Sequence, residues 1–304
     1  MRIRFMAFSA LFFLALAGAA PPAPRTAMLV SAGWLAQHLR DPDLVVLHVG
    51  PPESFAQHIP GARFVSLDDI SVSDHSGAGN MLELPAAEDL RGRLARLGIS
   101  DNSRVVVTYD DEWVSPATRA VFTLGAAGFG NRTSLLDGGM AAWRREHRPL
   151  TAAASPQRTG RLSPLHMQPW VADAAFVRAH AGRPGYVVID ARAPAFYDGV
   201  QVGRGHGGPH ERGHIPGARN IPFTTLTDAA TMVRPAAELA AAFQHAGVRP
   251  GDTIIAYCHV GQQATAIVFA ARSLGYRTLL YDGSFDDWSR RRLPVEPVAG
   301  SAHS

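Results

Sequence analysis

The sequence predicts an α/β protein built from two similar domains, each a parallel sheet flanked by helices. Two observations lead to this fold class. Apolar runs of strand length alternate with stretches typical of helices, such as Ala87 to Leu97 and Ala236 to Ala246, and this alternation is the pattern of parallel α/β sheets. One set of motifs also occurs twice, with a period of about 150 residues that is far too long for a solenoid.

The repeated motifs place the domains along the chain. His-Ile-Pro-Gly-Ala at residues 58–62 returns at 214–218, and Asp137-Gly138-Gly139 with Trp143 returns as Asp282-Gly283-Ser284 with Trp288. Strand-like runs repeat between them, at 45–47 and 187–189 and at 105–109 and 254–257. A Ser/Pro-containing stretch over 151–169 is the natural linker. We therefore expect a first domain over 26–150 and a second over 170–298, and 46% hydrophobic residues suffice for two ordinary cores.

The N-terminus resembles a secretory signal peptide. Arg2 and Arg4 precede an apolar run from Phe5 to Ala17, and small residues end the segment at Ala19. The sequence thus predicts a signal peptide over 1–19 and a periplasmic or secreted protein, with no stable membrane insertion after cleavage; a retained anchor is the alternative. Loss of the two arginines lowers the formal charge from +3 to +1, so no nucleic-acid partner is indicated.

The only cysteine, Cys258, closes the apolar run Ile254 to Tyr257 and precedes a helical stretch from Ala264 to Leu274. It is expected at the carboxyl end of a buried strand, on a short loop that leads into a helix N-terminus. Free N–H groups and the helix dipole favour a thiolate there, so we expect the thiol pKa to fall from about 8.5 to about 6.5. The alternative is an inert buried cysteine. A lone cysteine also excludes an internal disulfide.

These motifs together resemble the rhodanese family of sulfurtransferases. The resemblance rests on Ile-Asp-Ala-Arg at 189–192, Gly-His-Ile-Pro-Gly-Ala at 213–218, the strand that ends in Cys258, and Tyr-Asp-Gly-Ser at 281–284 with Trp288. It covers both halves, in the tandem arrangement in which the C-terminal domain is catalytic. It implies that 26–150 is a non-catalytic rhodanese-like domain and 170–298 the catalytic one.

The first half departs from the pattern where chemistry would occur. Aligned by motif, Asp110 stands at the position of Cys258, and Asp111 and Glu112 follow it. His48 stands at the position of Asp190 and Gly50 at that of Arg192, and the loop to Ala117 is one residue longer than the loop from Cys258 to Ala264. The half resembles the family's inactive partner domain. Its segment 71–85 resembles one laid near the cleft, with an ordinary surface loop as the alternative.

The resemblance implies covalent catalysis without a cofactor. The Cys258 thiolate would take the outer sulfur of an anionic donor as a persulfide and pass it to a thiophilic acceptor such as cyanide or a thiol. Backbone N–H groups of the loop residues His259, Val260, Gly261, Gln262 and Gln263 would hold the anionic sulfur. Arg192 is implied to bind the donor and Asp190 to fix the strand end. From the residues alone, an Asp-x-Arg pair is as often a structural ion pair.

The donor is open to two readings. The loop Cys-His-Val-Gly-Gln-Gln matches neither signature of the best-known two-domain thiosulfate and mercaptopyruvate enzymes, and Phe196 stands where many relatives have a second arginine. Arg204 or Arg212 would have to replace it. We predict thiosulfate as the donor, with 3-mercaptopyruvate as the alternative, because a mercaptopyruvate carboxylate needs a fuller clamp. A persulfide-carrying or sulfur-sensing binding module is a second class of function.

Other sites are weaker interpretations. A Cys-x5-Arg phosphatase needs arginine where Ala264 stands, and a thioredoxin-like site needs cysteine where Gly261 stands. His206, His210 and His214 are spaced four apart, but the glycines and proline between them exclude a regular helix, so no metal is predicted. The Gly-x-Gly-x-x-Gly at 203–208 is followed by Pro209 and does not join a strand to a helix, which excludes a dinucleotide site.

Overall fold

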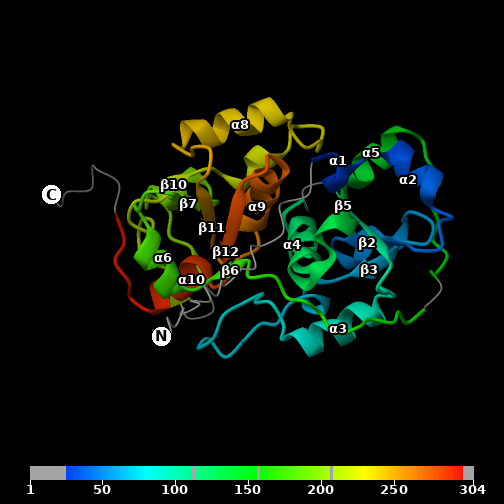
Figure 1. The fold of residues 1–304 in the computed structure, drawn as a ribbon, viewed down its shortest axis with the longest axis horizontal. Coiled ribbons are helices and arrows are strands. Elements are labelled where there is room, and N and C mark those ends of the chain that lie inside the picture. Colours follow the sequence, from blue (N-terminus) through cyan, green and yellow to red (C-terminus); the bar gives the residue numbers. More distant parts are fainter. Residues whose placement is uncertain (1–24, 111–113, 156–157, 206–207, 297–304) are drawn as a thin grey trace, which may run out of the picture.

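The computed structural model describes residues 25–110, 114–155, 158–205 and 208–296. Figure 1 shows two α/β domains side by side, joined by an extended segment. The predicted signal peptide, and Asp111, Glu112 and His206, lie outside the described residues. Within the described ranges, no helix has both the length and the apolar character needed to cross a bilayer.

The first domain holds a five-stranded sheet in the order β1-β5-β4-β2-β3, in which all paired strands are parallel. Its helices and strands are α1 (Arg25–Met28), β1 (Leu29–Val30), α2 (Ala32–His38), β2 (Leu44–Val49), β3 (Arg63–Val65), α3 (Ala87–Arg96), β4 (Arg104–Tyr109), α4 (Val114–Leu124), β5 (Thr133–Leu136) and α5 (Gly139–Arg145).

The second domain repeats this sheet, with the order β6-β12-β11-β7-β10 and only parallel pairs. It adds a small antiparallel hairpin, β8 with β9. Its elements are β6 (Val171–Ala172), α6 (Ala174–His180), β7 (Tyr186–Asp190), α7 (Pro194–Tyr197), β8 (Arg204–Gly205), β9 (Gly208–Pro209), β10 (Arg219–Asn220), α8 (Ala236–His245), β11 (Thr253–Tyr257), α9 (Ala264–Ser273), β12 (Arg277–Tyr281) and α10 (Ser284–Arg290).

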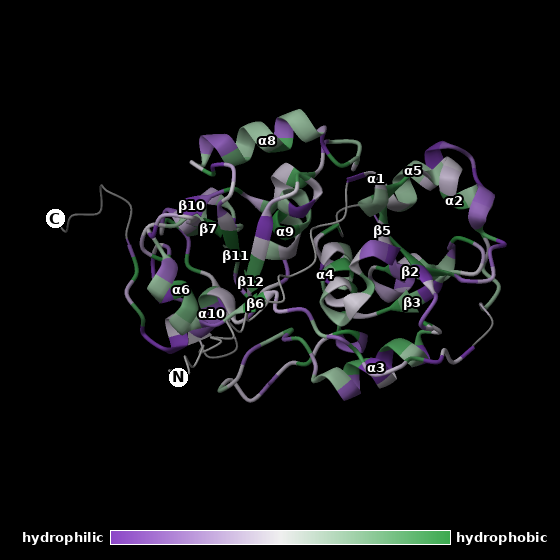
Figure 2. Cartoon of the chain, viewed as in Figure 1, coloured by the Kyte–Doolittle hydropathy of each residue, from purple (hydrophilic) through white to green (hydrophobic). Residues whose placement is uncertain are grey.

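The residue pattern accounts for these layers. The central strands β4 and β11 carry β-branched and apolar residues that are buried on both faces, as expected for a parallel sheet covered by helices. The outer helices are amphipathic: Leu90 and Leu94 of α3, and Leu239 and Phe243 of α8, point into the core at a spacing of four residues. Figure 2 shows the apolar strands enclosed by helices whose outer faces are more polar. The predicted fold class is confirmed.

The two His-Ile-Pro-Gly-Ala turns occupy equivalent places. The backbone of His58 pairs with Thr151, and that of His214 pairs with Glu296, each at the end of its own domain. The segment after Thr151 stays on the first domain, since Gly160 donates to the carbonyl of Ala95. The predicted linker therefore packs along one domain, and its bounds of 151–169 stay a prediction.

The sheet register corrects the alignment of the two strand ends. Corresponding rows are Leu47, Val107 and Leu135 in the first sheet, and Ile189, Ala256 and Leu280 in the second. Two residues further on, Tyr109 stands at the place of Cys258, and Asp110 at that of His259. The prediction that Asp110 replaces the cysteine is therefore wrong by one position. A tyrosine precedes both Asp110 and Cys258, and this shared residue suggested that the two positions were equivalent. Loop length varies freely between domains, so it could not test that alignment.

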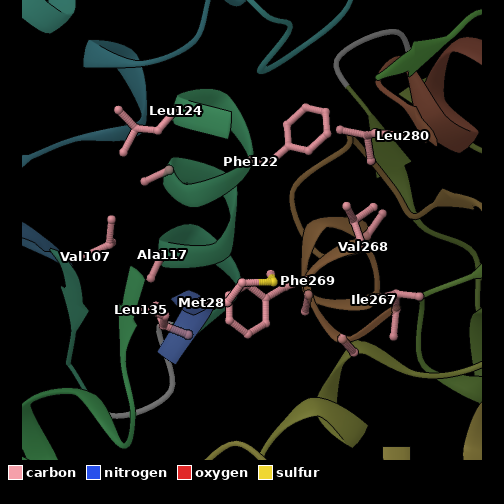
Figure 3. Close-up of a cluster of buried hydrophobic side chains, with 14 of the residues drawn as sticks. Met28, Val107, Ala117, Phe122, Leu124, Leu135, Ile267, Val268, Phe269 and Leu280 are labelled. Carbon is pink, nitrogen blue, oxygen red and sulfur yellow. The ribbon is translucent and has the colours of Figure 1, made fainter. Parts of the chain in front are cut away.

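The domains share one continuous core where α4 and α9 face each other. Figure 3 shows Phe122 of α4 and Val268 and Phe269 of α9 between the two sheets, with Met28 beside them. At the centre of this contact the hydroxyls of Thr118 and Thr265 lie 2.8 Å apart. The arrangement holds the N-terminus of α9, and the loop before it, against the first domain.

Candidate active site

Cys258 lies directly after β11 and is fully buried. Its N–H donates to the Ser284 hydroxyl at 3.1 Å, and its carbonyl accepts from the Phe285 N–H at 3.0 Å. Ser284 has a φ of +52°, and Gly139, its counterpart in the first domain, has the same value. A serine in this left-handed conformation is strained, and its hydroxyl is used to fix the cysteine backbone.

The sulfur of Cys258 is surrounded by backbone N–H groups at the start of α9. The donors are Val260, Gly261, Gln263 and Ala264, whereas the sequence expectation covered His259 to Gln263. Burial raises the thiol pKa, and these four N–H groups lower it without offsetting burial, so the pKa lies above its ordinary value. The expected fall in pKa is therefore wrong, because the first domain covers the loop.

Gly261 lets the loop curl around the sulfur. Its φ is +81°, and a Cβ there would lie 2.5 Å from the carbonyl oxygen of Asp282. Both the left-handed conformation and the lack of space require glycine. The loop can therefore turn its N–H groups inward only because no side chain occupies this position.

A buried ion pair from the first domain holds the same loop. Arg119 of α4 contacts Asp282 at 2.5 Å and donates to the Gly261 carbonyl at 3.3 Å. The side chains of Arg119 and Asp282 are 0% and 5% exposed. The Gln262 amide also donates to the Ser115 hydroxyl of α4. Sequence reasoning missed Arg119, although a single arginine in the apolar run of α4 was a visible signal.

The segment 71–85 lies against the second domain, as the resemblance implied, and is not a free surface loop. The Leu84 N–H donates to Asp282 at 2.9 Å. Arg290 of α10 donates to the Ala78 carbonyl and to the Asn80 side chain. The first domain thus covers Asp282 from two directions.

Arg192 is engaged by Asp190 and by the backbone. Its Nε lies 3.0 Å from both carboxylate oxygens, and its Nη2 lies 2.6 Å from Oδ2 and 2.8 Å from the Gly213 carbonyl. The guanidinium stacks 3.9 Å from the Phe285 ring. Both charged side chains are buried. This geometry favours the structural ion pair over a free anion ligand, while the charge lies on the ring of Phe285, whose N–H donates to the Cys258 carbonyl.

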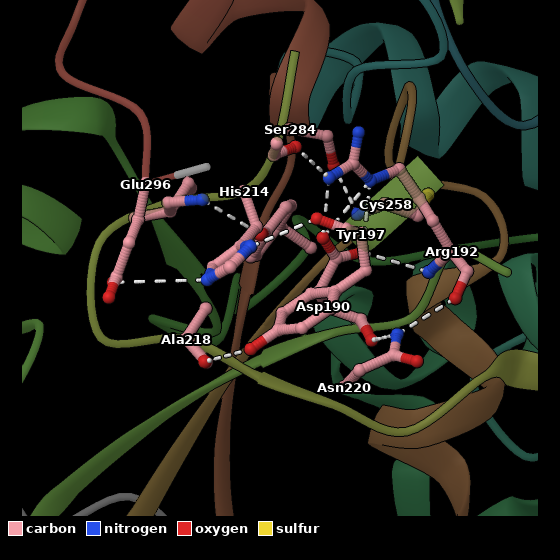
Figure 4. Close-up of polar contacts among 12 residues, drawn as sticks. Asp190, Arg192, Tyr197, His214, Ala218, Asn220, Cys258, Ser284 and Glu296 are labelled. Carbon is pink, nitrogen blue, oxygen red and sulfur yellow. Dashed lines mark hydrogen bonds and ion pairs between the residues drawn. The ribbon is translucent and has the colours of Figure 1, made fainter. Parts of the chain in front are cut away.

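A second layer of hydrogen bonds fixes this pair (Figure 4). The Asn220 amide donates to the carbonyls of Asp190 and Arg192, each at 2.9 Å. His214 lies against the Tyr197 ring and hydrogen bonds to its carbonyl. His214 thus fixes the turn against Tyr197.

Two further side chains, those of Phe196 and His210, pack near His259 of the loop. The Phe196 ring packs edge-on against the His259 ring at 4.7 Å, and the His210 ring lies 5.6 Å from it. Burial, Arg192 and His210 lower the pKa of His259 to about 4, so this imidazole is neutral at physiological pH. Arg204 and Arg212 are exposed, and Arg212 donates to the Gly199 carbonyl. Neither has a described contact with the cysteine loop.

The part of the chain that the structure describes contains no group of three or more His, Cys, Asp or Glu side chains able to hold a metal ion. His210 and His214, the described members of the series at 206, 210 and 214, hydrogen bond to Asp286 and to the Tyr197 carbonyl.

Comparison with known proteins places this site in a family. The profile of the Rhodanese-like domain matches residues 31–146 and 173–291. The chain belongs to the rhodanese family. Each matched segment contains four of the five strands of one sheet, so both domains are rhodanese-like.

Tandem rhodanese relatives match along most of their length. A putative thiosulfate sulfurtransferase of Mycobacterium tuberculosis is 36% identical, over 79% of this chain and 82% of the relative. A probable 3-mercaptopyruvate sulfurtransferase of Pseudomonas aeruginosa is 34% identical, over 90% and 98%. The crystal structure of an Escherichia coli protein, titled a 3-mercaptopyruvate sulfotransferase, is 28% identical with a TM-score of 0.73, over 84% of this chain and 98% of that one. This rhodanese is a sulfurtransferase.

Proposed function

We propose that this rhodanese transfers the sulfane sulfur of thiosulfate to a thiophilic acceptor through a persulfide on Cys258. The observation that carries the proposal is the set of four N–H groups directed at the Cys258 sulfur in a site closed to water. Such donors stabilise an anionic sulfur far better in a buried site than in water.

The proposed reaction has two steps. The Cys258 thiolate attacks the outer sulfur of thiosulfate, the sulfur–sulfur bond of the donor breaks, and sulfite leaves with the electron pair. A thiophilic acceptor, cyanide or a thiol, then bonds to the outer sulfur of the persulfide, and the Cys258 thiolate is released. Two easier transfers replace one difficult transfer, which predicts ping-pong kinetics.

The surroundings of Arg192 support thiosulfate over 3-mercaptopyruvate. A mercaptopyruvate carboxylate is usually held by a bidentate arginine with a second donor beside it. Here the Nε and Nη2 of Arg192 already bond to Asp190 and Gly213. Phe196, at the expected second arginine, packs on His259. Thiosulfate needs only N–H groups and a positive field. The alternative donor remains 3-mercaptopyruvate.

Mass spectrometry of the intact protein tests the proposal. Treatment with thiosulfate is expected to add one sulfur atom at Cys258, and cyanide is expected to remove it. Cys258→Ser should fold normally, because the change is small and lies in a loop, and should neither gain sulfur nor turn over. Turnover by Cys258→Ser with either donor would refute the proposal. Sulfur uptake without turnover on any acceptor would favour a persulfide-carrying or sulfur-sensing module.

We also propose that the protein is exported, to the periplasm or outside the cell, after cleavage of 1–19. The support is the residue pattern of Met1 to Ala19 alone. N-terminal sequencing of protein from fractionated cells tests it, and an intact Met1 in a cytoplasmic fraction would refute it.

A further inference from the structure

A buried imidazole–carboxylate pair lies next to the cysteine loop and has no role in the two steps above. His210 follows β9 of the hairpin, and its Nε2 lies 3.2 Å from Oδ1 of Asp286. The two side chains are 2% and 3% exposed. The other ring nitrogen, Nδ1, is buried and has no hydrogen-bond partner. A buried ring nitrogen without a hydrogen-bond partner destabilises the folded protein, so its retention calls for a functional explanation.

Backbone hydrogen bonds connect the start of α10, which carries Asp286, to the cysteine loop. Phe285 donates its N–H to the Cys258 carbonyl, and the next residue, Asp286, donates its N–H to the His259 carbonyl, each at 3.0 Å. The His210 ring packs near the His259 ring and edge-on to Phe285. The His210 ring thus lies 5.6 Å from the ring of His259, the residue that follows Cys258.

The backbone of the β8–β9 hairpin packs closely against this pair. A Cβ at Gly203 would lie 2.8 Å from the His259 ring and 3.0 Å from Nδ1 of His210. A Cβ at Gly205 would lie 1.5 Å from Oδ1 of Asp286. No side chain fits at either position, so the hairpin backbone closes directly over the two imidazoles.

The charges around the pair fix its hydrogen-bonding roles. Burial alone would raise the pKa of Asp286, but His210 and Arg290 lower it below its ordinary value. His259 is neutral, and Arg192 lies beyond Phe285. With Asp286 ionised, Nε2 of His210 carries the proton, and Nδ1 presents a lone pair on the side of His259.

We propose that His210, oriented by Asp286, accepts the proton of a thiol acceptor during discharge of the persulfide. This inference rests on the proposed function. The S–H proton passes to Nδ1 of His210, and the thiol's electron pair forms a bond to the outer sulfur of the Cys258 persulfide. The bond from that sulfur to Sγ breaks, and its electron pair remains on Cys258 as thiolate. Asp286 stabilises the imidazolium that results.

Single-turnover discharge tests the inference with acceptors that differ in their need for a base. The wild-type protein and each variant are loaded with thiosulfate, freed of excess donor, and mixed with 2-mercaptoethanol or with sulfite at a pH where sulfite is the dianion. His210→Gln is expected to slow discharge to 2-mercaptoethanol roughly a hundredfold, the scale of general-base catalysis, and discharge to sulfite less than about twofold. In His210→Gln, discharge to the more acidic trifluoroethanethiol should slow less than discharge to 2-mercaptoethanol. His245→Gln, at the exposed end of α8, is the matched control.

Asp286→Asn keeps the shape of the pair. It should also slow discharge to 2-mercaptoethanol more than discharge to sulfite, but by a smaller factor than His210→Gln does. This second variant covers the case in which glutamine at 210 disturbs the hairpin. Equal slowing with thiol and sulfite in both variants would assign the pair a structural role and overturn the inference, as would unchanged discharge to every thiol. Failure of the wild-type protein to take up sulfur would instead refute the proposed function, which is a distinguishable result.

Discussion

The two domains have the same sheet and different strand ends. At the carboxyl end of the central strand the first domain has Tyr109, whose hydroxyl donates to the Thr231 carbonyl of the second domain. The second domain has Cys258 at the same place, encircled by N–H groups. The same strand end thus makes an interdomain contact in the first domain and carries the candidate nucleophile in the second. The residue at that position and the loop after it determine the difference.

The helices after these loops differ in a second way. Thr118 and Thr265 meet across the interface, and the next residues are Arg119 in α4 and Ala266 in α9. Only Arg119 therefore crosses to the Asp-Gly motif of the other domain, where it pairs with Asp282.

The equivalent aspartate of the first domain has a weaker environment. Asp137 accepts a hydrogen bond from the Val233 N–H, as Asp282 does from Leu84. No ion pair of Asp137 occurs among the described residues. The first domain thus holds Asp282 of the second domain with an ion pair, whereas the second domain holds Asp137 with a hydrogen bond and, among the described residues, no ion pair.

The largest expected effect tests this asymmetry. Arg119→Met leaves the Asp282 carboxylate buried without its partner and should lower the free energy of unfolding by about 3–5 kcal/mol, with loss of sulfur uptake at Cys258. Asp137→Asn should cost about 1 kcal/mol, the scale of one hydrogen bond. Urea unfolding measures both. Arg119→Met combined with Asp282→Asn should recover much of the loss, and equal costs for the Arg119 and Asp137 variants would contradict the asymmetry.

The second effect concerns Arg192, whose counterpart in the first domain is Gly50. Arg192→Ala should lower kcat/KM for thiosulfate ten- to a hundredfold, about 1.5–3 kcal/mol, because it removes the positive charge that acts on His259, the residue after Cys258. In the wild-type protein, thiosulfate should have a higher kcat/KM than 3-mercaptopyruvate against one acceptor at fixed pH and salt. A clear preference for mercaptopyruvate, or an Arg192→Ala variant with unchanged kinetics, would remove the argument about the donor. Arg212→Ala, on an exposed side chain, is the control.

The third effect compares the acidities of the two strand ends. Burial raises the pKa of both the Tyr109 phenol and the Cys258 thiol, and the thiol has the larger set of opposing N–H groups. Because the thiol pKa lies above its ordinary value, the thiolate fraction is small at neutral pH and rises as pH rises. Alkylation of Cys258 by iodoacetamide should accelerate about tenfold per pH unit between pH 6 and about 8.5. A plateau already at neutral pH would show that the N–H groups outweigh burial.

The fold, and the position of Cys258 at the end of a buried strand, could be predicted because their signals are local. Strand-length apolar runs and a repeated turn specify the sheets, and a cysteine at the end of such a run lies at the carboxyl edge of the sheet. The thiol pKa could not be predicted, because it depends on burial by α4 and the segment 71–85, which belong to the other domain.

Contacts between distant residues account for the other misses. Arg119 and Asp282 are 163 positions apart, and His210 and Asp286 are 76 apart. Neither pair leaves a pattern in a short window of sequence. The register of Tyr109 was misassigned for a similar reason, because only pairing with the neighbouring strands fixes which residue is the last in the row.

The smallest expected effect is that a cysteine placed at the strand end of the first domain takes up no sulfur. The two positions to compare follow from the corrected strand register. Tyr109→Cys places a thiol at the true counterpart of Cys258, whereas Asp110→Cys places one at the counterpart of His259. Neither should acquire a second sulfur from thiosulfate. The chain from Tyr109 to Thr118 is nine residues long, whereas the chain from Cys258 to the facing Thr265 is seven, and burial at the first site raises the pKa of Tyr109. Intact mass after thiosulfate treatment, in a Cys258→Ser background, measures this directly. Sulfur at residue 109 alone would mean that the strand end suffices for the chemistry. Sulfur at residue 110 alone would restore the register inferred from the sequence.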